Sequence, residues 1–253
     1  MIQIKPAVGE CRVYRPMSST VSSLRAAPPG RPEEGLLVAL ILSFAAGYVD
    51  SYTWIIHGVL ANVQTAKLVF LWVNATAGQW QQAFQFVPPL FAFMIGVVIA
   101  SRLQRAAGAR AGQLSLLVEV AMLILISVLH NRVPEVVGTL GISMVAAMQA
   151  SIFTKVEGSV YSSVMITGNL RQAIDGAFAL VAGDPQHGLL RKSCIYMGVC
   201  TMFGTGAAAG AFVTERVPTL TLIVPIAALL LVLLVCARWR SVENSVGLIR
   251  RRR

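Results

Sequence analysis

Charged residues are scarce in this chain. Of its 253 residues, 13% are charged and 56% are hydrophobic, whereas a soluble domain ordinarily carries about 25% charged residues. Several apolar runs approach the roughly 20 residues with which a helix crosses the hydrocarbon core of a bilayer. Because these segments are apolar on all faces, they do not fit an ordinary soluble domain. The sequence therefore predicts an all-α, polytopic helical membrane protein.

The motifs of common enzymes and cofactor sites are also missing. There is no GxxxxGK[ST] phosphate loop, no HExxH pair and no GxSxG nucleophile, and the three histidines are scattered. The four cysteines fit no zinc or redox spacing; they are Cys11, Cys194, Cys200 and Cys236. We therefore expect no catalytic residue, no metal and no cofactor, and neither an enzyme nor an ATP-driven pump.

Positive charge is plentiful, but it lies mainly at the two ends. The net charge is +10, and basic residues cluster before the first apolar run and after the last: Lys5, Arg12, Arg15, Arg25 and Arg31, then Arg238, Arg240 and the run 250–253. Flanking basic residues fix the orientation of a membrane protein and contact anionic headgroups. We predict that both termini are cytoplasmic and that the bilayer, not a nucleic acid, is the partner of this charge.

The apolar architecture is written twice. Three long apolar segments are followed by three more, and after the first of each trio comes a shorter stretch spotted with polar residues, at 62–67 and at 167–172. The long segments are 36–54, 86–100 and 114–129, then 136–153, 195–213 and 220–235. Doubling around a polar interruption is typical of transporters. It predicts a transmembrane domain over 35–237, with one repeat at 36–130 and the other at 134–237.

The ends of the chain are expected to lie outside this domain. Residues 1–34 contain Pro28-Pro29-Gly30 and predict a disordered basic cytoplasmic tail. Residues 238–253 predict a basic cytoplasmic tail. No stretch before residue 35 has the apolar length of a secretory signal. We therefore expect the first span to be an uncleaved signal-anchor.

Six spans or eight is the main alternative, because residues 65–77 and 163–182 either cross the membrane or do not. If both cross, the basic loop at 102–110 becomes external, which the positive-inside rule disfavours. If neither crosses, the external basic residues are only Lys67, Arg132 and Arg216. The first stretch is also only about 13 residues, or roughly 20 Å of helix against a 30 Å core. We therefore prefer six spans with two short, non-spanning helices; three spans per half makes the repeats inverted.

Polar groups within the apolar spans need a role, since an ionisable group there costs roughly 2.5 to 3.5 kcal/mol. Apolar surroundings favour the neutral form of Glu119, which makes it a candidate proton carrier; the alternative is a hydrogen bond to a neighbouring helix. Asp50 either caps its helix near the interface or takes part in proton coupling. Gln149 suits a bond between helices. Arg171 and Asp175 stand four apart and pair on one helix face, either at the surface or beside a cavity.

The two polar breaks are the candidate substrate site. Unwound backbone beside a short helix exposes carbonyl and N–H groups to a ligand; the alternative is a loop that satisfies its own backbone. The candidate substrate-binding residues are Asn62, Gln64, Thr65, Thr167, Gly168 and Asn169.

Small residues predict a close helix contact. Gly206 and Gly210 form a small-xxx-small pattern, with Gly204 just before it. The partner helix belongs either to the same chain or to a second subunit, so a homo-oligomer stays open.

Several of these residues resemble those of a known family. The run Ala45-Ala46-Gly47-Tyr48-Val49-Asp50 resembles the signature that ends the first span of the YoaK-like bacterial membrane proteins, the domain of unknown function 1275. Thr167-Gly168-Asn169-Leu170 resembles their second polar motif, and Glu119 and residues 147–150 fall where that family has similar residues. The resemblance covers residues 36–238 and implies a six-span, multi-pass protein of the bacterial inner membrane, without an established activity. In one departure, the first break reads Asn62-Val63-Gln64-Thr65 where the family has Thr-Gly-Asn-Thr.

The doubled pattern favours a small secondary transporter, or permease, for an unidentified small molecule or ion. Coupling to protons would use Glu119 or Asp50. The alternative is a non-transporting assembly partner or sensor, whose basic tails and small-residue helix faces carry the interaction.

Overall fold

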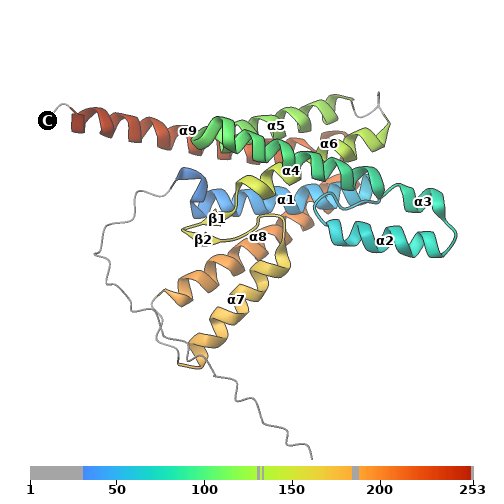
Figure 1. Ribbon diagram of the computed structural model, residues 1–253, viewed down its shortest axis with the longest axis horizontal. Helices are drawn as coiled ribbons and strands as arrows, with labels where there is room; N and C mark the ends of the chain where they lie inside the picture. Colours follow the sequence, from blue (N-terminus) through green and yellow to red (C-terminus); the bar gives the residue numbers. More distant parts are fainter. Residues whose placement is uncertain (1–30, 130–131, 133, 184–187, 252–253) are drawn as a thin grey trace, which may run out of the picture.

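The computed structural model describes residues 31–129, 132, 134–183 and 188–251. Within them the chain is almost entirely helical (Figure 1). The predicted disordered tail falls mostly outside the described residues, but its last residues form a short 3-10 turn, η1 (Pro32–Glu34). The all-α prediction also misses a hairpin of two short strands, β1 (Lys155–Val156) and β2 (Ser159–Val160). Its turn residues, Glu157 and Gly158, both have positive φ, as the tightest hairpin turns require.

In the first half of the chain, one long helix is followed by two shorter helices and then by two long ones. Its elements are α1 (Leu36–His57), α2 (Gln64–Thr76), α3 (Trp80–Phe84), α4 (Val87–Ala107), the 3-10 turn η2 (Gly108–Arg110) and α5 (Ala111–Leu129). Gly58 ends α1 in the left-handed conformation, which a glycine adopts without steric cost. Two prolines lie in the first turn of α4, where a missing N–H leaves no hydrogen bond unmade.

The second half follows the same order. Its elements are α6 (Glu135–Ile152), the β1–β2 hairpin, α7 (Ile166–Val181), α8 (Leu189–Arg216), the 3-10 turn η3 (Pro218–Leu220) and α9 (Ile223–Arg251). Residues 238–251, which belong to the predicted basic tail, continue α9 as a helix.

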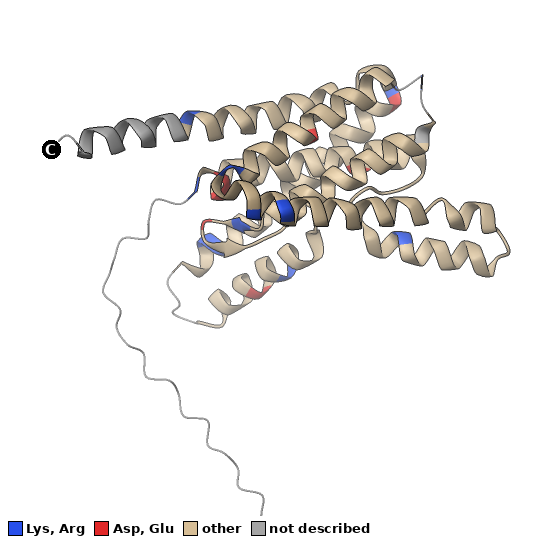
Figure 2. Ribbon diagram, turned by 45° about the horizontal axis from the view of Figure 1, so that its top comes forward, with Lys and Arg blue, Asp and Glu red and all other residues tan. Residues whose placement is uncertain are grey.

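Four segments of the described chain are long and apolar enough to cross a membrane: Leu36–His57, Trp80–Leu129, Leu189–Arg216 and Pro218–Trp239. The second has 50 residues and contains both α4 and α5, and α6 is a shorter apolar helix. Large apolar side chains are exposed on these helices, among them Phe91, Val128 and Leu234. Figure 2 shows that most of the ribbon carries no charge. Such surfaces face lipid, and the chain is a helical membrane protein.

Glycines bring two pairs of helices into close contact. A Cβ atom on Gly206 or Gly210 of α8 would collide with backbone carbonyls of α1, and a Cβ atom on Gly96 of α4 would collide with that of Met144 in α6. The small-xxx-small face therefore packs within this chain. The prediction that Gly204 belongs to this packing face is wrong. Gly204 lies on another side of α8 and faces open space, with no neighbouring atom within 4 Å of a Cβ placed there.

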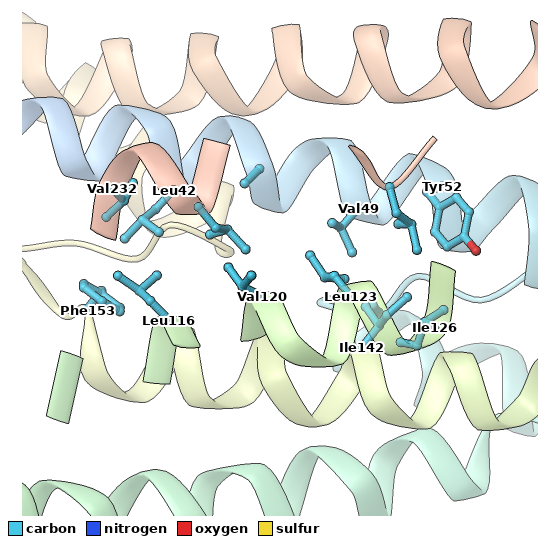
Figure 3. Close-up of a cluster of buried hydrophobic side chains, with 14 of the residues drawn as sticks. Leu42, Val49, Tyr52, Leu116, Val120, Leu123, Ile126, Ile142, Phe153 and Val232 are labelled. Carbon is cyan, nitrogen blue, oxygen red and sulfur yellow. The ribbon is translucent and has the colours of Figure 1, made fainter. Parts of the chain in front are cut away.

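The main apolar core lies where α1, α5, α6 and α9 meet. Figure 3 shows its side chains pointing toward one another from these helices, among them Leu42, Leu116, Leu123, Ile142 and Val232, and none of the five is more than 1% exposed. α8 lies along the other side of α1, and α7 packs on α8 (Figure 1). This arrangement fixes the position of α1. Asp50 lies within α1, which continues to His57, and so it does not cap the end of its helix as the sequence had suggested.

Candidate functional site

A cavity of about 870 Å³ lies where the two polar breaks meet. Residues 62–65 of the first break and 164–167 of the second both line it, together with parts of α1 and α8 and with Phe93 of α4. Its wall is mainly apolar and includes Trp54, Phe93 and Phe203. This size and lining are those of a small-molecule site.

The short helices α2 and α7 both begin at this cavity, halfway along the bundle. Lys67 of α2 bonds Ser143 in the middle of α6, and the carbonyl of Ile166 accepts a weak bond from Cys200 in the middle of α8. Neither helix has a side-chain cap at its start. The first N–H groups of a helix have no partner within it and carry partial positive charge, so both helices offer donors to the cavity.

Asp50 fixes the first break. Its Oδ1 accepts a hydrogen bond from the backbone N–H of Asn62 at 2.9 Å, and the side chain of Asn62 donates from Nδ2 to the carbonyl of Ala46 at 3.2 Å. Asp50 and Asn62 are 5% and 6% exposed, and both line the cavity. The Oδ1 atom of Asn62 is buried without a hydrogen-bond partner. A buried acceptor of this kind is costly unless something donates to it.

Lys67 was expected on the external side of the membrane and was not among the predicted site residues. The structure buries it, with 1% exposed. Its Nζ donates to the carbonyl of Ala61 at 2.8 Å, to Oε1 of Gln64 at 3.0 Å and to Oγ of Ser143 at 3.2 Å. Burial is tolerated because all three N–H groups are bonded. Its only sequence signal is a lone lysine in an apolar helix.

The second break is held by neutral groups. Gln149, near the end of α6, donates from Nε2 to the carbonyl of Leu42 at 3.3 Å and to Oγ of Ser163 at 2.9 Å. Asn169 bonds Ser162 twice, through its Nδ2 to the carbonyl and through its Oδ1 from the N–H. Of the predicted residues here, Thr167 lines the cavity, whereas Gly168 and Asn169 do not. Asn169 instead satisfies the loop.

Glu119 lies behind the first break, in the core. It is 6% exposed, and its Oε2 has no hydrogen-bond partner. A second, very small cavity of about 10 Å³ is lined by Glu119, Asn62 and Gln149, close to the space that one water molecule needs. Asn62 therefore lies between the large cavity and the carboxyl group of Glu119.

Two other ion pairs lie away from the cavity. Arg171 and Asp175 pair at 3.4 Å on the surface of α7, with side chains 82% and 69% exposed, so they take the surface role. Glu157 of the hairpin turn contacts Arg191 of α8 at 2.8 Å, and its N–H bonds the carbonyl of Glu34. Hydrogen bonding to Arg191 lowers the pKa of Glu157. This contact was not predicted from the sequence. It joins the hairpin to α8 and to η1.

Glu215, near the end of α8, is a further cavity residue that was not predicted. With Asp50 it gives the cavity two carboxylates, while no Lys or Arg of the described part of the chain lines it. Among the residues that the structure describes, no three His, Cys, Asp or Glu side chains gather as a metal site would need.

Comparison with known proteins identifies a family. Neither the curated proteins nor the solved structures gave a match. The family model described as a protein of unknown function, DUF1275, matches residues 38–236. The resemblance drawn from the short motifs is thus confirmed, and the chain belongs to the DUF1275 family.

Proposed function

We propose that this protein is a small secondary transporter that binds its substrate in the large cavity. The observation that carries the proposal is that the breaks of both halves line one cavity, beside the starts of two half-length helices. In secondary transporters, interrupted helices from two repeats surround a central site in this way. The proposal includes six spans, with α4, α5 and α6 each crossing the bilayer, and a place in the bacterial inner membrane.

Packing supports two related halves. A repeat would exchange α1 with α6, α2 with α7, α4 with α8 and α5 with α9. The contact of α1 with α8 then corresponds to that of α6 with α4, and the contact of α1 with α9 corresponds to that of α6 with α5. All four contacts are present, as a two-fold relation requires.

Helix directions favour inversion of these halves. α1 and α6 run in opposite directions, because Gln149 near the end of α6 bonds Leu42 near the start of α1, and Gly138 near the start of α6 faces His57 at the end of α1. α7 runs toward the start of α8, where Ala173 accepts a bond from Ser193. α2 runs toward the start of α4, where Phe70 contacts Phe86. The two short helices therefore point to opposite ends of the bundle.

Proton coupling is assigned in the proposal to Glu119. Glu119 is buried among apolar side chains, and its Oε2 has no hydrogen-bond partner among the described residues. The small cavity, which Glu119 and Asn62 both line, is about the size that one water molecule would need, and Asn62 also lines the substrate cavity. Protonation of Glu119 would thereby respond to what occupies the larger cavity.

Uptake by proteoliposomes tests the proposal. Purified protein is reconstituted with a pH-sensitive dye inside, and a panel of amino acids, amines, organic acids and sugars is added with and without an inward proton gradient. At least one compound should move protons, and Glu119→Gln should uncouple that flux while Asp175→Asn, on the exposed face of α7, preserves it. Absence of flux for every compound would contradict transport; full coupling in Glu119→Gln would contradict the role of Glu119.

A further inference from the structure

Three kinds of group line the large cavity, namely carboxylates, backbone N–H donors and apolar side chains. Each kind would contact a different part of a ligand. Asp50 and Glu215 are carboxylates, and none of the described Lys and Arg residues lines the cavity. The starts of α2 and α7 supply backbone donors. Trp54, Phe93 and Phe203 supply an apolar wall. Lys67 lies behind the first break and does not line the cavity. Among the described residues, the lining that a ligand meets therefore carries carboxylates and no basic side chain, which points to a cationic group in the ligand.

The Oδ1 of Asn62 is buried and has no hydrogen-bond partner among the described residues; Asn62 lines both the large cavity and the small one beside Glu119. The residue is 6% exposed. An amide oxygen accepts hydrogen bonds, so the group that satisfies it must be a donor. Lys67 cannot serve, because its three N–H groups already have acceptors. A protonated amine beside Asn62 and Asp50 would supply both the donor and the charge.

The two helix starts are not equivalent, and this difference sets the orientation of the ligand. At α2, Asp50 already accepts the N–H of Asn62 and places a negative charge there. At α7, the corresponding group is the neutral amide of Gln149, which bonds Ser163. The start of α7 therefore keeps uncompensated donors, next to the hydroxyl-bearing Thr167. A carboxylate fits this end of the cavity.

We propose that the cavity binds a zwitterion of the amino-acid type with an apolar side chain. Its ammonium group lies beside Asp50 and Asn62, its carboxylate at the start of α7, and its side chain against Trp54, Phe93 and Phe203. The inference rests on the proposed function only in taking this cavity as the substrate site. It names the substrate class, which the proposed function leaves open.

A matched ligand series tests this class by binding alone. L-phenylalanine carries both charged groups, phenethylamine lacks the carboxylate, and 3-phenylpropionate lacks the ammonium group, while all three share one apolar body. Binding is measured by calorimetry on the full-length protein in lipid nanodiscs, with empty nanodiscs as the background. L-phenylalanine should bind at least tenfold tighter than either analogue. Equal or tighter binding of one analogue, or no binding of any member, would overturn the inference.

Two variants locate the ammonium end. Asp50→Asn should weaken L-phenylalanine binding at least tenfold and leave 3-phenylpropionate unchanged, whereas Asp175→Asn should change neither. Equal loss for both ligands in Asp50→Asn would contradict the proposed orientation; the series on the unaltered protein keeps its meaning even if this variant does not fold. Binding of L-phenylalanine without flux would count against transport but not against the ligand class. Flux of a compound from another class, without binding of any member of this series, would count against the ligand class but not against transport.

Discussion

At the scale of single residues, the first break depends on one buried cation and one buried anion. Asp50 accepts the N–H of Asn62, and Lys67 donates to the carbonyl of Ala61 immediately before it. Each charge is thus bonded to backbone that the chain leaves unpaired between α1 and α2. Removing either partner leaves the other charge buried without compensation, which is costly in a low-dielectric interior.

Replacing Lys67 by methionine should therefore lower stability strongly, by about 3 kcal/mol. The side chain keeps a similar length but removes the donor to Gln64 Oε1 and to Ser143 Oγ, and one of the two donors to the carbonyl of Ala61. The double variant Asp50→Asn with Lys67→Met should lose clearly less than the sum of the single losses. Thermal unfolding in detergent, followed by size exclusion, measures this; additive losses would show that the two charges do not interact.

The position of Lys67 also shows what the sequence does not contain. A lone lysine in an apolar helix is visible in the sequence, but its direction is not. It points inward because Ser143, 76 residues away, offers an acceptor. The same applies to Glu215, which lines the cavity only because α8 lies along α1.

At the scale of helices, the contact between α1 and α8 positions Asp50 beside the cavity. The contact depends on glycines whose hydrogen faces a carbonyl group. Gly206→Ala should force these helices apart and cost about 1 to 3 kcal/mol. Gly204→Ala, two residues earlier and facing open space, is the matched control and should not destabilise the protein. Equal effects on the thermal midpoint would mean that the contact is loose.

The hairpin between α6 and α7 should show a pH-dependent contribution to stability. Because Arg191 lowers the pKa of Glu157 in the folded protein, the ionised pair stabilises the fold at pH values above the ordinary carboxyl pKa. This contribution is lost as the pH falls through the lowered pKa. The stability difference between the unaltered protein and Glu157→Gln should be present at pH 7 and disappear in acid.

High salt should reduce this difference as well, since the pair is partly exposed. A difference that persists unchanged in acid would mean that Glu157 acts through its backbone turn and not through its charge.

At the scale of the whole molecule, the two halves should lie in opposite orientations in the membrane. The native cysteines are replaced, and one new cysteine is introduced at Gln79, Ala106 or Ala182. All three residues are exposed and lie at or near helix ends. In intact cells, an impermeant thiol reagent should label Gln79→Cys and spare Ala106→Cys and Ala182→Cys. The eight-span arrangement gives labelling at Ala106→Cys and none at Gln79→Cys, which would overturn the inverted one.

Much of the architecture was predictable, because helix length and apolar composition are local properties. The order of long and short helices, with the breaks after α1 and α6, agrees with the sequence expectation. The hairpin at Glu157 and the helical continuation of α9 were not expected. Asn169 was predicted to bind substrate, but it bonds Ser162 instead. Arg171 pairs with Asp175 at the surface because both side chains are exposed on α7. These are distances between segments, which periodicity does not determine.

The most direct test of the account is whether the cavity opens to each side of the membrane in turn. Ala211 lines the cavity, and Ala211→Cys adds a small thiol there in a background without other cysteines. An impermeant thiol reagent should modify it in right-side-out and in inside-out vesicles, and a compound that the protein transports should slow the reaction from one side while speeding it from the other. Modification from one side only, under every condition, would contradict transport through this cavity.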